Sequence, residues 1–261
     1  MLTVFDIGMF DGADTKYHLQ NGFRVVAVEG NPDLVASAEK TLASYVSAGQ
    51  LVCVNKAISA DGEPVELVLS GADLGASSTQ ADRIASRWPI GKLKVAGTTM
   101  RQLIEEYGVP HFIKSDIEGA DRFCVLGLAA STRPQYLSYE AGEDFDELLR
   151  YCGEIGYSKF KIINQVSFRE LANQRNFRDR LVLGITRRLG YAEFKRVKRA
   201  GRFFVSGHSA GPAPWCSDGA WRSADETLAR WNRAKDAGAL TAWYDVHATT
   251  KSCLSRARAT S

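Results

Sequence analysis

Short apolar runs alternate with amphipathic segments along the first 165 residues of the chain. Buried strands are expected over 2–5, 23–28, 51–54, 64–69, 109–114, 134–139 and 158–163. Helices are expected over 14–20, 33–48, 99–107, 119–128 and 145–153. Asn31 suits an N-cap, with Pro32 at the first helical position. Repeated strand–helix units predict an α/β protein with a mainly parallel central sheet and helices on both faces.

The pattern changes beyond about residue 165. Residues 166–201 are basic and irregular, 207–221 are rich in Gly, Pro and Trp, and 223–238 are typical of a helix. A strand-like segment, Thr241 to His247, precedes a polar tail. Because apolar residues are scattered here and no βαβ pattern is evident, we expect 166–261 to pack on a core formed by 1–165.

Composition narrows the class of protein. The 261 residues are 45% hydrophobic and 24% charged, as in a soluble globular chain. No run reaches the roughly 18 apolar residues of a membrane span, and the first residues lack the pattern of a signal peptide. We therefore expect a cytoplasmic protein without integral membrane association. The five cysteines form no C-x-x-C pair, which favours reduced thiols over a zinc knuckle or a disulfide framework.

Charge is unevenly distributed. Residues 150–202 hold 14 Lys and Arg against 4 acidic residues, a local charge of +10 in a chain of net charge +3. A basic run with nearby aromatic residues suits nucleic acid, an anionic acceptor or an anionic membrane surface. A solvated surface is the simpler interpretation.

The first candidate site follows the first strand. The sequence Asp6-Ile-Gly8-Met-Phe10-Asp11-Gly12 supplies glycines that let the backbone turn sharply and approach a ligand. Glu29 ends the second strand, where an acidic side chain can accept both hydroxyls of a ribose. The G-x-G-x-x-G spacing of pyrophosphate-binding turns is absent, so a ligand with a ribose and no pyrophosphate fits better than a nicotinamide dinucleotide.

A second group of acids follows the strand 109–114, in Lys114-Ser-Asp116-Ile-Glu118-Gly119-Ala-Asp121. This strand end should face the same crevice as Asp6 and Glu29. Clustered carboxylates repel one another unless a cation, a metal or a positively charged ligand is near. S-adenosylmethionine carries such charge in its sulfonium and amino groups. A solvated loop with acids at a helix N-terminus is the alternative.

These motifs together resemble those of a known family. Asp6-x-Gly8-x-x-x-Gly12, Glu29-x-Asn31-Pro32, Asn55-Lys-Ala57, Ser77-Ser78, Thr99-Met-Arg-Gln-Leu103 and Lys114-x-Asp116-x-Glu118-Gly119 look like the FkbM family of S-adenosylmethionine-dependent methyltransferases. The resemblance spans about residues 3 to 165. It implies a class I Rossmann-like methyltransferase fold and methylation of hydroxyls on sugars, glycolipids, polyketides or other secondary metabolites.

The resemblance also implies a cofactor site. Asp6, Gly8 and Gly12 would hold the methionine part and Glu29 the ribose. The adenosine would lie against Asn31 and the turn from Asn55 to Ala57. Phe10 also falls in this loop, where many relatives carry Asn, and Asp116 adjoins the cofactor.

Asp116, Glu118 and His247 are the candidates for catalysis. Asp116 is the first candidate for the base that removes the acceptor's proton, because it leaves a strand end beside the cofactor. With Glu118 or Glu140 it could instead hold a divalent metal such as Mg²⁺, or it could merely brace the cofactor. His247 is the second candidate base, beside Trp243 and Asp245.

The favoured function is O-methylation of a small or glycosidic acceptor, with 166–261 as an acceptor-binding cover. Pro212, Pro214, Trp215 and Trp221 would then offer an aromatic surface to a sugar ring. The alternatives are a nucleic-acid-binding protein or RNA methyltransferase that uses residues 150–202, and, less favoured, a nicotinamide-dependent oxidoreductase. The sequence predicts neither the acceptor nor the oligomeric state.

Overall fold

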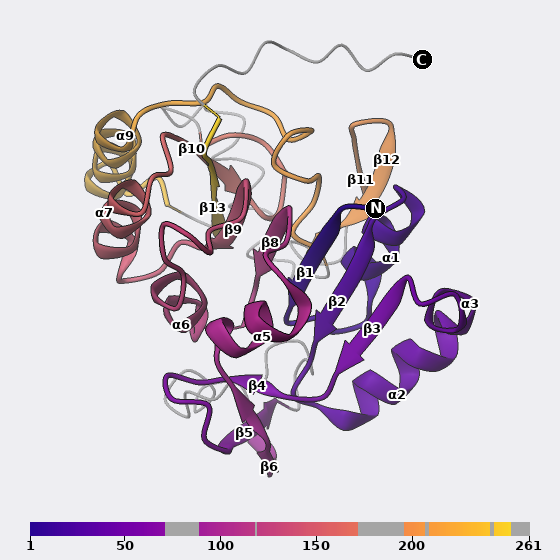
Figure 1. Cartoon of the computed structure of the whole chain (residues 1–261). Coiled ribbons are helices and arrows are strands. Elements are labelled where there is room, and N and C mark those ends of the chain that lie inside the picture. The colour runs from indigo at the N-terminus through magenta and orange to yellow at the C-terminus, as the bar shows by residue number, and fades with distance from the viewer. Residues whose placement is uncertain (71–88, 118, 172–195, 207–208, 241–242, 252–261) are drawn as a thin grey trace.

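A seven-stranded sheet forms the centre of the computed structural model (Figure 1). Residues 1–70, 89–117, 119–171, 196–206, 209–240 and 243–251 are described. The strands lie in the order β10 (Lys159–Asn164), β13 (Tyr244–Thr249), β9 (Tyr136–Glu140), β8 (Phe112–Ser115), β1 (Thr3–Ile7), β2 (Arg24–Val28) and β3 (Leu51–Val54). Only β13 runs antiparallel to its neighbours. The predicted α/β class with a mainly parallel sheet is confirmed.

Helices cover both faces of this sheet (Figure 1). One face carries α1 (Ala13–Gln20), α2 (Pro32–Thr41) and α3 (Ala43–Ser47); the other carries α5 (Met100–Tyr107), α6 (Asp121–Leu126), α7 (Phe145–Glu154) and α9 (Ala224–Asp236). Asn31 caps α2 by accepting the Asp33 N–H, as predicted. The helix expected over 33–48 is two helices, because the backbone of the buried Leu42 leaves the helical region. No helix among the described residues is long and apolar enough to cross a membrane.

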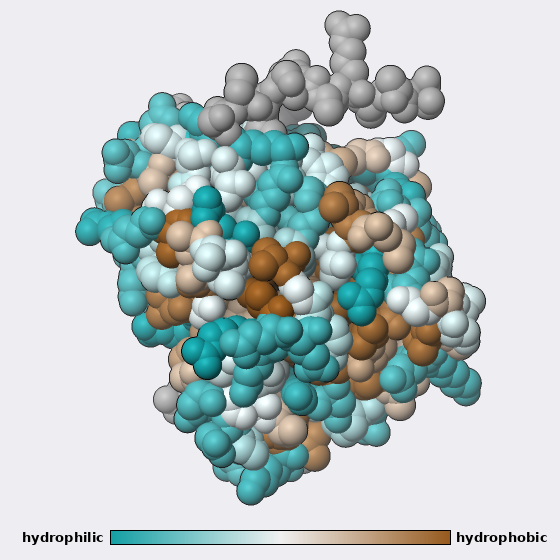
Figure 2. Space-filling model, viewed as in Figure 1, coloured by the Kyte–Doolittle hydropathy of each residue, from teal (hydrophilic) through white to brown (hydrophobic). Residues whose placement is uncertain are grey.

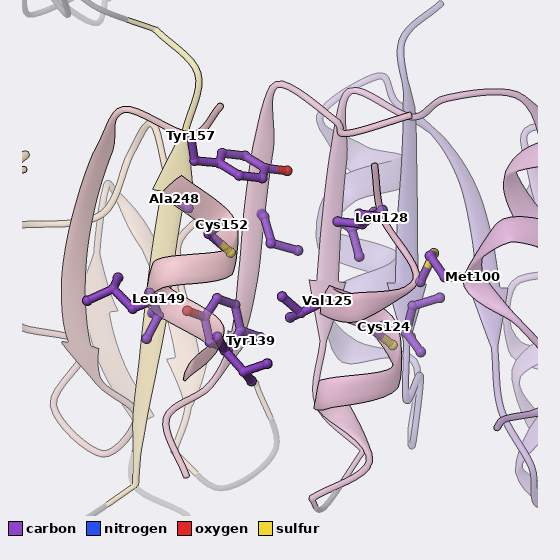
Figure 3. Packing of buried hydrophobic residues seen from close by; sticks show 14 of the residues in the cluster. Met100, Cys124, Val125, Leu128, Tyr139, Leu149, Cys152, Tyr157 and Ala248 are labelled. Atoms are coloured by element: carbon purple, nitrogen blue, oxygen red, sulfur yellow. The ribbon is translucent and has the colours of Figure 1, made fainter. Parts of the chain in front are cut away.

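The main hydrophobic core lies between the sheet and the helices α5, α6, α7 and α9. Figure 3 shows its packing around Met100 of α5, Cys124 and Val125 of α6, Leu149 and Cys152 of α7, Tyr139 of β9 and Ala248 of β13. Cys124 and Cys152 are free thiols buried in this core, as expected, whereas Cys53 is half-buried and Cys216 is exposed.

The opposite face of the sheet carries a buried polar row. Register places one side chain from each of five neighbouring strands side by side: Asp6, Lys114, Ser138, His247 and Lys161. All five are almost fully buried. Paired positions in neighbouring strands point to the same face, so these groups form one continuous line across the sheet. A polar line inside a fold needs partners, and α1 and residues 209–222 supply them for every member of the row except Ser138.

Residues beyond 165 take part in this architecture. The strand β13 lies between β9 and β10, and α9 packs against α7. On the polar face, Lys161 Nζ donates to the Ser217 carbonyl at 2.8 Å and lies 4.3 Å from the Trp221 ring centre. The central sheet therefore continues beyond the boundary at residue 165.

Trp215 lies elsewhere than expected. Trp215 packs against Phe23, His111, Phe112 and Tyr136. His111 precedes β8 and Tyr136 begins β9, so this contact is at the amino ends of the strands. Trp215 therefore does not contribute an aromatic surface for a sugar ring at the carboxyl ends of the strands. Its ring instead completes the apolar packing below the polar row.

Three small two-stranded ribbons complete the described structure. They pair β4 (Ala57–Ile58) with β7 (Gly97–Thr98), β5 (Val65–Ser70) with β6 (Pro89–Val95), and β11 (Arg196–Arg199) with β12 (Arg202–Val205). The strand predicted over 64–69 is thus β5, which lies outside the main sheet. In Figure 2 hydrophilic residues cover most of the face in view, and apolar residues form separate patches.

Candidate active site

The turns after β1 and β8 touch each other at the carboxyl ends of the strands. Gly8 has a φ of 79°, and a Cβ atom there would lie 2.0 Å from the Asp116 carbonyl oxygen. The Asp116 N–H donates to the Ile7 carbonyl at 3.0 Å. Only glycine fits both the left-handed backbone and this close approach. The spacing Asp6-x-Gly8 therefore serves contact between two loops as well as a sharp turn.

Glu29 lies between the turn after β1 and the start of α2. Its Oε2 accepts the Phe10 N–H at 3.0 Å, and its Oε1 accepts the Asn31 N–H at 2.9 Å. Phe10 has a φ of 51°, a costly conformation for a residue with a side chain. Burial raises the pKa of the Glu29 carboxyl, and the two N–H donors oppose that shift. Each oxygen keeps a lone pair for a further donor, so the side chain fits a ribose diol.

The neighbouring asparagines brace this turn. Asn55 Nδ2 donates to the carbonyls of Glu29 at 2.9 Å and Gly30 at 3.0 Å. The side chain of Asn31 is buried and already accepts the Asp33 N–H as the cap of α2. Ala57 is a core residue of β4 whose N–H donates to the Ala96 carbonyl. These contacts fix the backbone around Glu29, which is where an adenosine would approach.

Lys114 is the centre of charge in the site. Its Nζ lies 2.9 Å from the Gly8 carbonyl oxygen, 3.2 Å from Asp6 Oδ1, 3.7 Å from Asp14 Oδ2 and 3.8 Å from Asp116 Oδ2. Burial disfavours the ammonium, but the carboxylates of Asp6, Asp116 and Asp14 outweigh it and hold the pKa of Lys114 above its ordinary value. The cation that the acidic cluster requires is therefore a side chain of the chain itself.

The carboxylates around Lys114 differ in exposure. Asp6 is fully buried, and its Oδ2 accepts the Thr15 hydroxyl at 2.6 Å. Asp14 is also buried, and burial raises its pKa to about 6 although Lys114 opposes the shift. The side chain of Asp116 is 34% exposed. Of the three, Asp116 is the carboxylate open to a ligand.

Two of these residues were not assigned a role from the sequence. Lys114 is the one charged residue in an otherwise apolar strand pattern, and Asp14 stands in the first turn of α1. The Lys114 position carries a signal in the sequence, since a charge in a buried strand needs a partner. Gly12, the N-cap position of α1, has a φ of 78°, and a Cβ atom there would lie 3.7 Å from Leu42 Cδ1 and 3.8 Å from Ala38 Cβ.

No three His, Cys, Asp or Glu side chains in the described part of the chain are grouped as a metal site. Glu118, the proposed partner of Asp116, lies outside the described residues, as do Ser77 and Ser78. Glu140 ends β9 at the same edge of the sheet as Asp116. Asp121 is buried, and it accepts the Ser115 hydroxyl at 2.7 Å and the Gly119 N–H at 3.3 Å.

His247 lies in the polar row on β13, where it pairs with Ser138, two residues before the end of β9. Its Nδ1 lies 2.9 Å from the Ser217 hydroxyl, and its side chain is buried. Burial and the nearby Lys161 hold the pKa of His247 well below its ordinary value. Burial also lowers the pKa of Lys161 to about 8. In this structure the neutral imidazole connects residues 209–222 to the sheet.

A comparison with family models matches residues 6–159 to the methyltransferase FkbM domain. The chain belongs to this family. The match covers Asp6, Glu29 and Lys114, the residues that form the geometry described above. It confirms the resemblance noted in the motifs and favours S-adenosylmethionine-dependent methyl transfer over nicotinamide chemistry. The mainly parallel sheet with one antiparallel strand agrees with the Rossmann-like methyltransferase fold that membership of this family implies.

Three solved structures are similar at low identity. One is a precorrin-6y C5,15-methyltransferase from Geobacter metallireducens GS-15, with 12% identity and a TM-score of 0.36 over 62% of this chain and 66% of that chain. Another is a TehB-like SAM-dependent methyltransferase from Corynebacterium glutamicum ATCC 13032 Kitasato, with 10% identity and a TM-score of 0.35 over 62% of this chain and 68% of that chain. The third is phosphoethanolamine N-methyltransferase 2 from Haemonchus contortus in complex with S-adenosyl-L-methionine, with 9% identity and a TM-score of 0.35 over 95% of this chain and 48% of that chain. The match thus spans about two thirds of the first two proteins and half of the third. The sequence has no match among curated proteins.

Proposed function

We propose that the protein transfers the methyl group of S-adenosylmethionine to a hydroxyl of a sugar, glycolipid or secondary metabolite. The observation that carries this proposal is the arrangement of Glu29, Gly8 and Asp116 at the carboxyl ends of adjacent strands, where ligands of parallel sheets bind. The family match supports the cofactor. The hydroxyl acceptor follows from the resemblance of the motifs.

The segments that follow β1, β2 and β3 hold the cofactor in this proposal. Glu29 accepts the ribose hydroxyls, and the backbone from Gly8 to Gly12, with Phe10, lies against the methionine part. Asn31, Asn55 and Ala57 shape the adenosine side. Lys114 neutralises Asp6 and Asp14 and fixes the Gly8 carbonyl by a hydrogen bond. The site is thereby preorganised, so little reorganisation is needed on binding.

Methyl transfer from a sulfonium is an in-line displacement for which the cofactor supplies the electrophilic carbon. What the chain must supply is orientation and a destination for the acceptor's proton. Asp116 takes that proton in our proposal, because its partly exposed carboxylate lies at the strand end. A placed base commonly contributes about 10²- to 10⁴-fold in rate. His247 instead anchors the cover, through Ser217.

In this proposal 1–165 form the cofactor-binding core and 166–261 supply the acceptor-binding cover through residues 209–222, while β13 and α9 of the same segment complete the sheet and its helical layer. Ser209 Oγ donates to Asp14 Oδ1, and the Ala210 N–H donates to Asp14 Oδ2 at 2.9 Å. Since Asp14 also lies 3.7 Å from Lys114, the cover is tied to the charged centre of the cofactor site.

Transfer of tritium from labelled S-adenosylmethionine tests the function. The panel contains methyl glycosides, glycolipid headgroups and phenols, each with its O-methylated counterpart as a negative control. We expect label in a base-stable methyl ether. Label only on nitrogen or carbon, or no label although the cofactor product S-adenosylhomocysteine binds, would contradict O-methylation.

A second candidate, RNA methylation, is favoured by one surface. On the hairpin β11–β12, Arg196 and Lys198 lie 4.9 Å and 5.9 Å from the ring centre of Phe203, which is 58% exposed. Cations beside an exposed aromatic ring suit phosphates and stacked bases. RNA binding that weakens steeply with salt and is lost in Arg196→Ala/Lys198→Ala would favour this function.

A further inference from the structure

Asp245 is a buried carboxyl with one unused oxygen. Its side chain is 1% exposed, and its Oδ1 accepts the Gln165 amide at 2.7 Å. Its Oδ2 has no hydrogen-bond partner among the described residues. A buried polar atom left unpaired costs about 1–3 kcal/mol, so proteins keep few of them. Gln165 already fixes the carboxyl group, so the second oxygen is not needed to hold the side chain in place.

The position of Asp245 places this oxygen at the ligand-binding edge. Asp245 pairs with Glu140, the last residue of β9, and with Ile163 near the end of β10. Its side chain points to the same face of the sheet as that of His247, and it lies two residues closer to the carboxyl edge. Glu140 follows Ser138, which pairs with Lys114. Asp116, Glu140 and Asp245 therefore follow one another along the edge, above the polar row.

The charges around Asp245 support a ligand-facing role. Burial, with the carboxylates of Asp116 and Asp121, raises the pKa of Asp245 well above its ordinary value, while Gln165 and Lys114 oppose the shift. Lys114 already pairs with Asp6, Asp14 and Asp116, so a further acid beside this group is unfavourable for stability alone. Stability is commonly sacrificed at such positions when a ligand uses them.

We propose that Oδ2 of Asp245 hydrogen-bonds a hydroxyl group of the acceptor, which makes Asp245 an acceptor-binding residue beside Asp116. The proposal rests on the proposed function. Asp245 lies beyond residues 6–159 and so outside the matched family domain. It reaches the site because β13 is inserted between β9 and β10. The cofactor turn and Glu29 are not involved.

Two substitutions and one matched control test this role. Asp245→Val removes both oxygens, whereas Asp245→Asn keeps the shape and the oxygen that accepts from Gln165 and puts an amide donor in place of Oδ2. Ser138→Ala is the control, because Ser138 Oγ is also buried and without a partner but lies in the polar row below the edge. The acceptor is the one that takes most tritium in the transfer assay with the wild-type protein.

We expect Asp245→Val to raise KM for that acceptor about 10- to 100-fold, and Asp245→Asn to raise it less than about tenfold. The affinity for S-adenosylhomocysteine should not change in either, and Ser138→Ala should keep the wild-type KM. The melting temperature of Asp245→Asn without acceptor should equal or exceed that of the wild type, because this variant keeps the hydrogen bond from Gln165.

Either of two results would overturn the assignment: an unchanged KM in both Asp245 variants, or a lower melting temperature of Asp245→Asn with a KM change in both variants no larger than that of Ser138→Ala. Failure of the proposed function looks different. In that case the wild-type protein itself labels no hydroxyl acceptor.

Discussion

The ε-amino group of Lys114 lies 3.2 Å from the carboxylate of Asp6, and the two side chains are 5% and 0% exposed. This ion pair joins β8 to β1 directly below the loops that form the candidate cofactor site. The same ammonium donates to the Gly8 carbonyl at 2.9 Å. One buried cation therefore balances the acids of the site and fixes the turn that approaches the ligand.

Replacing Lys114 by Met should destabilise the protein strongly. The substitution keeps the length of the side chain and leaves Asp6 and Asp14 buried without a counter-charge, a loss of about 3–5 kcal/mol. Urea unfolding measures the change. Lys92→Met is the matched control, because Lys92 pairs with Glu66 at 2.6 Å with both side chains more than half exposed. The control should lose less than about 1 kcal/mol. Equal losses would show that Lys114 contributes no more than a surface pair.

Gly8→Ala should abolish cofactor binding. The new Cβ would meet the Asp116 carbonyl at 2.0 Å, so one of the two loops must move. Gly22→Ala provides the control, since Gly22 has nearly the same φ, 80°, and no atom within 4 Å of the added carbon. Both variants bear the strain of a left-handed alanine, about 1–2 kcal/mol, and only Gly8→Ala adds the collision. Calorimetric titration with S-adenosylhomocysteine should therefore separate them, and similar affinities would contradict the loop contact.

The strands and helices of the first 165 residues could be predicted because their signals are local. Apolar runs mark β1, β2 and β3, and Asn31 with Pro32 marks the start of α2. Gly8 and Glu29 were identifiable because a glycine turn and an acid at successive strand ends imply a common edge. Local patterns of this kind do not depend on the rest of the chain.

Contacts between distant segments were not predictable in the same way. The strand β13 lies between β9 and β10, with which it pairs although both come much earlier in the chain. The sequence carries no local signal for pairing between such distant segments. Asp245 lies at the carboxyl edge of the sheet because of this insertion, so its unpaired oxygen could not be predicted from the sequence either. Trp215 was misplaced for a similar reason: a tryptophan in a Gly- and Pro-rich loop fits a ligand surface or core packing equally well.

Asp116→Asn should slow methyl transfer and leave cofactor affinity nearly unchanged. The amide keeps the volume of the side chain but cannot take a proton, so kcat should fall about 10²- to 10⁴-fold. The measurement is steady-state transfer to the acceptor identified with tritium, beside titration with S-adenosylhomocysteine. Full turnover by this variant would remove Asp116 from the mechanism.

His18 should make stability depend on pH. Burial lowers the pKa of its imidazole to about 4, while in the unfolded chain it is near 6.5. Between these values the unfolded chain binds the extra proton, so the free energy of unfolding falls as pH drops from about 6.5 toward 4. From pH 7 to 5 this loss amounts to about 2 kcal/mol.

His18→Phe should remove that part of the loss and preserve the ring contacts with Tyr17, Phe23 and Phe112. Urea unfolding of both proteins at pH 7 and pH 5 gives the comparison. The same decrease in both would show that His18 does not titrate between these pH values.

Binding of S-adenosylhomocysteine to the wild-type protein and to Glu29→Ala tests the central claim most directly, because it needs no acceptor. Isothermal titration should show binding to the wild-type protein, no binding of NAD, and affinity for S-adenosylhomocysteine about 10- to 100-fold weaker in Glu29→Ala. Glu39→Ala, an exposed position on α2, should bind like the wild type. A folded Glu29→Ala protein with wild-type affinity, or a wild-type protein that binds NAD in preference, would contradict the account.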